Sequence, residues 1–313
     1  MGHLNHTMVT HFFMQGISDD PELQVPIFLL VLFIYLMTVG SNMTLLLLVC
    51  LDLQLHTPMY FFLGNLAIVD ITSATVSLHH FLIAFMTGNR FVSYVNCFSQ
   101  MFFFGVFICS ELHLLMVMSY DRYVAVCNPL RYTVIMSNRV CFLLAMFCWV
   151  SSLLVNVPLI ILLSDISCYR SNVINHFVCD PMPLLKLSCS DTSVLEILLF
   201  VEGLLFFNTI PSLVTFTPYV FIIVTILKIP TGTGKRKAFY TCSSHLTVVI
   251  LLYVILNCQY MRPVTEESMD SSKLLSLFNT AAIPILNPLI YSLNNKDVKS
   301  ALRRRWRYFH KTY

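Results

Sequence analysis

Residues 26–50 read PIFLLVLFIYLMTVGSNMTLLLLVC and contain no Asp, Glu, Lys, Arg or His. A helix that crosses the hydrocarbon core of a bilayer needs about 20 mainly apolar residues, so this stretch is long enough to span it. Six further stretches satisfy the same criterion, at 58–80, 97–121, 140–163, 195–227, 238–261 and 272–293. The pattern predicts an all-α membrane protein whose seven-transmembrane helix bundle occupies 26–293.

The overall composition agrees with a membrane protein and excludes a soluble one. Of the 313 residues, 57% are hydrophobic and only 11% are charged. Soluble domains carry about 25% charged residues, because water must wet their surface. So few charges cannot cover a globule of this size, and most of the surface is therefore expected to face lipid.

The basic residues between the apolar stretches indicate an orientation. Fourteen of the 19 Lys and Arg residues lie between the third and fourth stretches, between the fifth and sixth, or after the seventh. Cytoplasmic segments of membrane proteins carry the excess of Lys and Arg. We therefore expect 1–25 to be extracellular and the tail 294–313 to be cytoplasmic, which an odd number of spans allows.

The tail mixes basic and large apolar side chains. Arg303, Arg304, Arg305 and Arg307 alternate with Leu302, Trp306, Tyr308 and Phe309. Helices that lie on the anionic inner leaflet of a membrane use this mixture. We expect a short cytoplasmic amphipathic helix after the seventh span; the alternative is a disordered basic tail.

Two acidic residues, Asp70 and Glu111, lie in the middle of apolar stretches. A charge at that depth in a bilayer costs at least about 2.5 kcal/mol, so such residues face the bundle interior and have partners. They are candidates for a functional site.

Two short motifs occur on the third and seventh spans. Asp121-Arg122-Tyr123 ends the third span, and Asn287-Pro288-Leu289-Ile290-Tyr291 lies near the end of the seventh. Together these strings resemble the rhodopsin-like (class A) G-protein-coupled receptors. Longer strings narrow the resemblance to the olfactory receptor family: LHTPMYFFLGNLA at 55–67, MSYDRYVAVCNPLRYTVIMS at 118–137, KAFYTCSSHL at 237–246 and PILNPLIYSLNNKDV at 284–298.

The resemblance implies an odorant receptor in the plasma membrane that activates a stimulatory G protein and raises cyclic AMP. Its partners would be a small-molecule odorant, the G protein and the lipid bilayer, with no nucleic acid. We expect no enzyme, because the chain lacks phosphate-loop, zinc-protease and nucleophile-elbow motifs. The alternatives are a receptor of the same fold for a metabolite, and a small-solute transporter. The first half of the chain does not mirror the second, as the halves of many transporters do.

The chain departs from the family pattern at helices that move during activation in related receptors. Pro218 stands where the family usually has Ser, and Leu252 and Val254 stand where it has Phe and Gly. These departures bear on coupling efficiency and not on the fold.

By the resemblance, one group of residues takes part in activation and G-protein coupling. Arg122 would pair with Asp121 at rest and be released on activation; the alternative for Arg122 is a simple positive anchor at the membrane border. Tyr291 would swing during activation, or anchor the helix at the interface. The full set is Asp121, Arg122, Tyr123, Tyr219, His245, Asn287, Pro288 and Tyr291.

A second group would form a polar cavity inside the bundle. The resemblance implies that Asp70, Glu111, Asn42 and Asn287 line it and that it can hold a sodium ion. Oxygen ligands alone suit such a hard cation. The alternative is a protonated, hydrogen-bonded cluster without metal. No other cofactor is expected.

The expected covalent features lie on the outer side. Cys168, Cys179 and Cys189 share one polar stretch and Cys97 opens an apolar run. The resemblance implies the disulfides Cys97–Cys179 and Cys168–Cys189. Asn5-His6-Thr7 is a glycosylation sequon, so we expect a glycan on Asn5.

The resemblance implies that the ligand lies in the outer half of the bundle, between the third, fifth, sixth and seventh helices. Positions three or four apart share a helix face, which gives candidate lining residues on each of these helices. None is Lys or Arg, so we expect a neutral, apolar ligand with one oxygen function. The candidates are Phe104, Gly105, Ile108, Cys109, Leu112, Gly203, Phe206, Phe207, Tyr253, Leu256, Asn257, Tyr260, Asn279 and Thr280.

Overall fold

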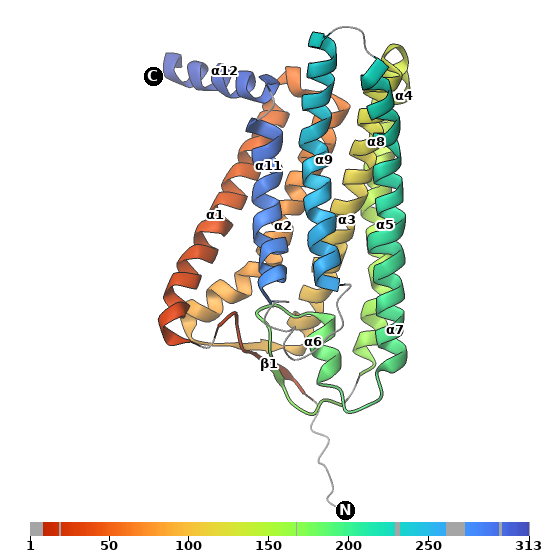
Figure 1. Ribbon diagram of the computed structural model, residues 1–313. Helices are drawn as coiled ribbons and strands as arrows, with labels where there is room; N and C mark the ends of the chain where they lie inside the picture. Colours follow the sequence, from red (N-terminus) through yellow and green to blue (C-terminus); the bar gives the residue numbers. More distant parts are fainter. Residues whose placement is uncertain are drawn as a thin grey trace, which may run out of the picture.

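The computed structural model describes residues 9–18, 20–166, 168–228, 232–260, 273–293 and 296–312. Its helices form an elongated bundle (Figure 1). Strand β1 (His11–Met14) lies at one end of the bundle and helix α12 (Lys296–Thr312) at the other. We call these the β1 end and the α12 end.

Each of the seven expected spans corresponds to helix in the structure. Among the described residues, six helical segments are long and apolar enough to cross a membrane; the sixth expected span is represented by a shorter apolar stretch, His245–Cys258. In chain order the helices that build the bundle are α1 (Pro21–Leu51), α2 (Pro58–Thr87), α3 (Tyr94–Cys127), α5 (Asn138–Ser164), α7 (Ser193–Glu202), α8 (Ile210–Lys228), α9 (Gly232–Tyr260) and α11 (Ile283–Leu293).

Several helices extend beyond the apolar stretches, because polar caps rather than hydropathy set their ends. Helix α1 begins at Pro21, where the Asp20 side chain accepts a hydrogen bond of 3.0 Å from the Glu22 backbone N–H. Helix α2 continues to Thr87 and stops at Gly88, whose φ of 71° lies in the left-handed region that glycine adopts without strain. Residues 21–25, which were expected to belong to the N-terminal tail, are therefore part of helix α1.

Two helices contain π-helical segments. One, Gly203–Thr209, joins α7 to α8, and the other, Phe278–Ala282, precedes α11. Pro211 and Pro284 follow these segments closely. A proline lacks the backbone N–H of a regular helical turn, and single π turns are frequent at functional sites. Each π turn changes which side chains face the bundle interior.

A three-stranded sheet covers the β1 end. Strand β1 is central, pairing antiparallel with β2 (Phe91–Ser93) and parallel with β3 (Val173–Ile174). Phe12 of β1 is fully buried and packs with residues of α3, α5 and the segment between α5 and α7. This segment also contains α6 (Pro181–Lys186). The expected all-α fold includes no strand here, and a strand as short as β1, with 4 residues, has no clear signal in the sequence.

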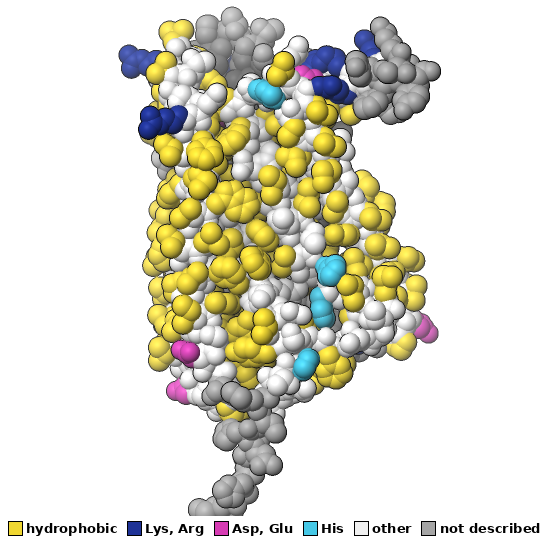
Figure 2. All heavy atoms as spheres, turned by 180° about the vertical axis from the view of Figure 1, so that it is seen from behind, with side chains coloured by type: hydrophobic (Ala, Val, Ile, Leu, Met, Phe, Trp, Pro, Cys, Tyr) yellow, Lys and Arg dark blue, Asp and Glu magenta, His cyan; other side chains and the backbone are white. Residues whose placement is uncertain are grey.

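The surface between the two ends is apolar. Figure 2 shows hydrophobic side chains over most of this face, with Lys and Arg gathered at the α12 end. The exposed apolar residues include Leu29 and Phe33 of α1, Leu154 of α5 and Leu213 of α8. The main buried core lies inside, around α2, α3 and α9. This pattern is that of a helix bundle with lipid around it.

Helix α12 occupies the place of the expected amphipathic helix and runs across the end of the bundle (Figure 1). The Arg304 guanidinium donates to Asp52 Oδ2 from Nε at 3.1 Å and from a terminal nitrogen at 2.7 Å. This ion pair holds the pKa of Asp52 below its usual range. Arg304 is 41% exposed, so solvent screens the pair, and its contribution to stability is small.

Candidate functional site

A cavity of about 950 Å³, counting the part that opens to solvent, lies toward the β1 end. Its wall is contributed by α3, α5, the π-helical segment with the end of α7, α9, and the segment that precedes α6. Most lining atoms are apolar. The lining residues are Met101, Phe102, Phe104, Gly105, Ile108, Asn156, Leu159, Ile160, Leu163, Cys179, Asp180, Pro181, Met182, Leu199, Glu202, Gly203, Phe207, Asn208, Leu256 and Asn257.

The three asparagines of the cavity are tied to the helices that carry them. Asn208 and Asn257 exchange hydrogen bonds of 2.8 and 3.2 Å between their side-chain amides. Asn156 Nδ2 donates to the Ser152 carbonyl at 2.8 Å. The Asn156 oxygen lies against Gly105, where a Cβ would lie only 2.2 Å away. Glycine therefore lets α3 and α5 approach each other closely at this wall.

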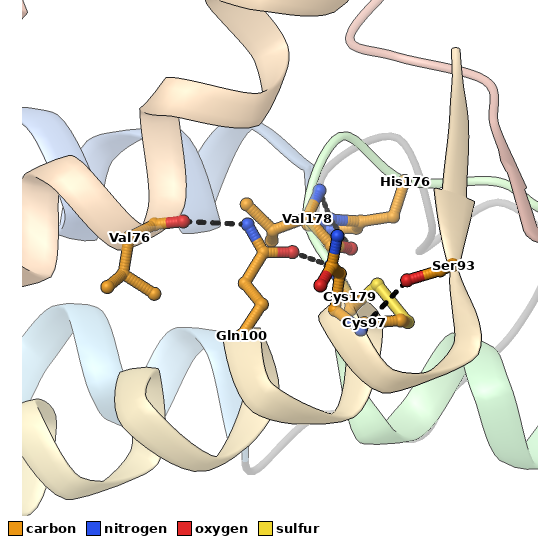
Figure 3. Close-up of a disulfide and its surroundings, with 8 residues drawn as sticks. Val76, Ser93, Cys97, Gln100, His176, Val178 and Cys179 are labelled. Atoms are coloured by element: carbon orange, nitrogen blue, oxygen red, sulfur yellow. Dashed lines mark hydrogen bonds between the residues drawn. A yellow bond between two sulfur atoms is a disulfide. The ribbon is translucent and has the colours of Figure 1, made fainter.

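A disulfide positions the part of the wall that comes from the segment before α6. Cys97 at the start of α3 is bonded to Cys179, and the Gln100 oxygen accepts from the Cys179 N–H at 2.9 Å (Figure 3). The Gln100 amide nitrogen donates to the Val76 carbonyl at 2.8 Å. A second disulfide joins Cys168 and Cys189. Both pairs are those that the sequence analysis expected.

Asp180 follows this disulfide directly and is buried in the wall. Its Oδ1 accepts the Met182 backbone N–H at 3.0 Å, which caps α6. Burial raises the pKa of Asp180 to about 6, although the Met182 hydrogen bond acts in the opposite direction. Asp180 is therefore partly protonated near neutral pH.

A polar cluster lies deeper in the bundle. Asn287 Nδ2 donates to both carboxylate oxygens of Asp70 and to Glu111 Oε1, each at 3.1 Å. Both acids are buried, and Asn287 Oδ1 has no hydrogen-bond partner. Two buried carboxyl groups that share one amide need a cation or a proton to be stable there.

This cluster fits a sodium ion, because its side chains offer oxygen ligands to a hard cation. Asp70, Glu111 and Asn287 offer oxygen ligands, and the Asn287 oxygen is buried without a donor. Asn42 Nδ2 donates to the Pro284 carbonyl at 2.8 Å and to the Thr38 carbonyl at 3.1 Å, while its Oδ1 is buried without a hydrogen-bond partner. Asn42 links α1 to the helix that carries Asn287. The Pro284 carbonyl can accept because Pro288, four residues later, has no N–H to donate to it.

A third group lies toward the α12 end. Asp121 is fully buried and accepts hydrogen bonds from the Arg122 guanidinium and, at 2.7 Å, from the Tyr132 hydroxyl. The Tyr219 hydroxyl is hydrogen-bonded to His245 Nδ1, so α8 and α9 are joined there. Four of the expected coupling residues therefore form two pairs here, Asp121 with Arg122 and Tyr219 with His245. Asn287 belongs to the polar cluster instead.

The comparisons with known proteins identify the family. The family model described as "Olfactory receptor" matches residues 31–307. The chain belongs to the olfactory receptor family. It is 44% identical to Olfactory receptor 6C3 of Homo sapiens over 300 residues, 96% of each chain. It is 44% identical to Olfactory receptor 5AR1 of Mus musculus over 301 residues, also 96% of each.

A solved structure gives the fold of this olfactory receptor. Squid rhodopsin matches 93% of this chain and 88% of its own, with a TM-score of 0.68 and 19% sequence identity. At that identity the match concerns the fold alone, which is the rhodopsin-like seven-helix bundle. The expected fold class and family are confirmed, and this olfactory receptor is a multi-pass membrane protein and not an enzyme.

Half of the residues expected in the odorant pocket of this olfactory receptor line the cavity. They are Phe104, Gly105, Ile108, Gly203, Phe207, Leu256 and Asn257. Six others lie outside its wall: Cys109, Leu112, Phe206, Tyr253, Asn279 and Thr280. The side chain of Tyr260 is not among those that the structure describes, and the same holds for Tyr291 of the coupling set; Asn5 lies outside the described residues.

The side chains outside the wall have other surroundings. Phe206 is 46% exposed on the outside of the bundle. The Tyr253 hydroxyl lies 3.4 Å from Thr215 Oγ1, and Thr280 donates to the Ser276 carbonyl at 2.8 Å. Leu112 is buried in the main core, toward α9 and the other helices there. Helical spacing groups residues on one face but does not say which face meets the cavity.

The sequence analysis missed the contributions of α5 and of the segment before α6, and two acids. Asn156 and Leu159 of α5, Asp180 and Glu202 line the cavity. Asp180 could have been found, since it directly follows a cysteine expected to tie its segment to α3. Glu202 had no such signal, because the sequence places it in an apolar span without indicating its face.

Proposed function

We propose that this olfactory receptor binds a small, largely apolar odorant in the cavity and thereby activates a stimulatory G protein at the α12 end, raising cyclic AMP. The main support is the cavity itself, which is lined by apolar side chains and a few polar groups, as small-molecule sites are. The family's shared function supports the receptor role, while the odorant and the G protein type belong to the proposal.

The orientation in this proposal follows the basic residues. Lys and Arg gather at the α12 end (Figure 2), and cytoplasmic segments carry the excess of such residues. The cavity then opens toward the outside of the cell, and the Asp121–Arg122 pair faces the cytoplasm. An odorant outside the cell can reach this cavity when the receptor lies in the plasma membrane.

Helix α3 offers a physical link between the two ends. It carries Ile108 in the cavity wall, Glu111 in the polar cluster and Asp121 near the α12 end. Ser119 of α3 donates to the Thr215 carbonyl of α8 at 2.6 Å. A ligand that binds one arrangement of α3, α8 and α9 more tightly shifts the population of the pairs at the other end.

We also propose that Asp70, Glu111 and Asn287 hold a sodium ion in the resting receptor. When bound, the ion would neutralise one of the two carboxylates. The alternative remains a proton shared by the two acids. Either form keeps α2, α3 and α11 together through the Asn287 amide.

The sequence analysis expected a neutral ligand because the candidate lining held no Lys or Arg. The cavity wall described here also holds no Lys or Arg, but it contains Asp180 and Glu202. Two carboxyl groups change the polarity that a ligand meets. We therefore propose a ligand with a largely apolar body and do not require it to be neutral.

A cyclic AMP assay on cells that express the full chain tests the proposed function. A broad odorant panel should yield at least one ligand that raises cyclic AMP, and Arg122→Ala should abolish the response at equal surface expression. Phe207→Ala should weaken that ligand's response, because Phe207 lines the cavity. Phe206→Ala is the matched control, since Phe206 is the adjacent residue and is exposed outside the wall.

The outcome that contradicts the proposal is equally concrete. If Phe206→Ala and Phe207→Ala change the response alike, the cavity is not the ligand site. If no odorant raises cyclic AMP in cells with the receptor at their surface, the coupling is wrong.

A further inference from the structure

Glu202 is a half-buried acid whose position no structural role explains. It is the last residue of α7, directly before the π-helical segment, and it lines the cavity. Among the described residues, none donates a hydrogen bond to it or forms a salt bridge with it. A carboxylate removed from water without a partner is costly. When a ligand fills the cavity and displaces water, a group of that ligand must offset this cost.

The other acids nearby have partners or water. Glu196, on the same helix, is exposed and accepts a hydrogen bond from the Thr192 hydroxyl at 2.8 Å. Asp180 caps α6 through the Met182 N–H. Glu202 is thus the acid in this region whose position is not accounted for by the fold.

The polar groups of the wall offer more acceptors than donors to a ligand. Asn257 Nδ2 already donates to the Tyr253 carbonyl at 2.7 Å and to Asn208 Oδ1 at 3.2 Å. Asn156 Nδ2 donates to the Ser152 carbonyl, and no described group donates to its oxygen. The carboxylate of Glu202 accepts only. A ligand that satisfies this wall must therefore supply hydrogen-bond donors.

The rest of the wall suits a positive charge. It contains no Lys, Arg or His. Phe102, Phe104 and Phe207 line it, and aromatic faces attract cations. Small ammonium groups, with up to three N–H donors, match both the acceptors and the aromatic rings, whereas a carboxylate ligand would be repelled by Glu202.

We propose that the cavity binds a small alkyl amine in its protonated form, with its ammonium group paired to Glu202 and its alkyl chain on the apolar wall. This inference rests on the proposed function, because it names the ligand class of the same cavity. Alkylammonium groups lose their proton only near pH 10, so the ligand carries its charge at neutral pH.

The test compares alkyl amines and alkanols of equal chain length, from butyl to octyl, in the cyclic AMP assay on full-length receptor. The wild type should respond to amines at lower concentration than to the matching alcohols. Glu202→Gln should raise the half-maximal amine concentration by about tenfold or more, since the lost partner is charged. The alcohol response should change much less.

Glu196→Gln is the matched control, because it makes the same chemical change on the exposed part of the same helix. It should leave the amine response at the wild-type concentration. A binding measurement accompanies the assay: hexylamine should raise the thermal unfolding temperature of purified wild-type receptor, and of Glu196→Gln, but not of Glu202→Gln.

The outcomes separate this inference from the proposed function. Alcohols that act through the cavity while amines are no more potent would overturn the inference alone. So would equal losses for both ligand classes in Glu202→Gln, or a loss of amine preference in Asp180→Asn only. A receptor at the cell surface that answers neither these series nor the broad odorant panel would overturn the proposed function, and the inference with it.

Discussion

At the scale of single residues, Gly105 allows α3 and α5 to pack closely in the cavity wall. A Cβ at this position would lie 2.2 Å from Asn156 Oδ1, while a Cβ at Gly203, also in the wall, would meet nothing within 4 Å. A shift of the Asn156 amide away from this Cβ would disturb its hydrogen bond to the Ser152 carbonyl. The two glycines therefore form a matched pair for substitution.

We predict that Gly105→Ala destabilises the receptor and that Gly203→Ala does not. Overpacking costs about 1–3 kcal/mol, against about 1 kcal/mol that alanine gains over glycine within a helix. Thermal unfolding of the purified receptor should place Gly105→Ala below Gly203→Ala. Odorant potency should also fall more in Gly105→Ala, because the displaced Asn156 lines the cavity. Equal unfolding temperatures for the two variants would contradict the prediction.

A second residue-scale prediction concerns Asp70 and Glu111. It distinguishes a bound sodium ion from a proton shared by the two carboxyl groups. The purified receptor should unfold at a higher temperature in sodium chloride than in choline chloride of equal ionic strength. The gain is about 1 kcal/mol where sodium exceeds its dissociation constant fivefold. Asp70→Asn should abolish the difference, and Asp191→Asn, at an exposed position, should keep it. No sodium effect in the wild type would favour the protonated cluster.

At the scale of elements, the segment between α5 and α7 depends on a buried histidine. His176 Nδ1 lies 3.1 Å from both the backbone N–H and the carbonyl oxygen of Val178, and only a neutral ring can accept from this N–H. Burial, with Lys273 nearby, lowers the pKa of His176 to about 4. The same segment supplies Cys179 and Asp180 to the cavity wall, so its stability bears on ligand binding.

We predict that acid weakens this segment through His176. The ordinary pKa of a histidine is about 6.5, so the unfolded state takes up a proton first as pH falls. The stability from His176 is complete above about pH 6.5 and is lost as pH falls toward 4; at pH 5 the loss is about 2 kcal/mol. Asp180 acts in the opposite direction, since its raised pKa favours the folded state as pH falls below about 6.

A comparison of variants isolates the histidine from Asp180. His176→Asn keeps an acceptor near the Nδ1 position and does not titrate. Its unfolding temperature should fall less than that of the wild type between pH 7.5 and pH 5, while Asp180 contributes alike to both. A drop as large as in the wild type would mean that His176 is not the titrating group.

At the scale of the whole molecule, hydropathy was sufficient for the bundle and insufficient for the site. The apolar stretches predict where helices lie, because in lipid each backbone group must be satisfied within its own helix. Which side chains face the cavity depends on helix rotation, and the π-helical segment 203–209 alters this rotation in the middle of a helix. Phe206 and Phe207 were equivalent in the sequence, yet only Phe207 lines the cavity.

Long-range contacts also explain what the sequence could not supply. Strand β1 lies between β2 and β3, which are far from it and from each other in the chain, and no local pattern predicts such pairing. Asp180 reaches the cavity because the Cys97–Cys179 disulfide joins residues 82 positions apart. The resemblance implied this cysteine pairing. It did not indicate that Asp180, next to Cys179, would line the cavity.

The orientation of the molecule gives the last prediction. The cavity can receive an odorant from outside, and Arg122 can meet a G protein inside, only if the β1 end is extracellular. An epitope tag at the N-terminus should be labelled by antibody on intact cells, and a tag after Tyr313 only after permeabilisation. Asn5→Gln should remove a glycan and increase the electrophoretic mobility of the receptor, because glycans are added only on the side that becomes extracellular. If both tags are labelled on the same side, the number of spans is even, and the cavity and the Arg122 pair cannot serve as the two ends of one receptor.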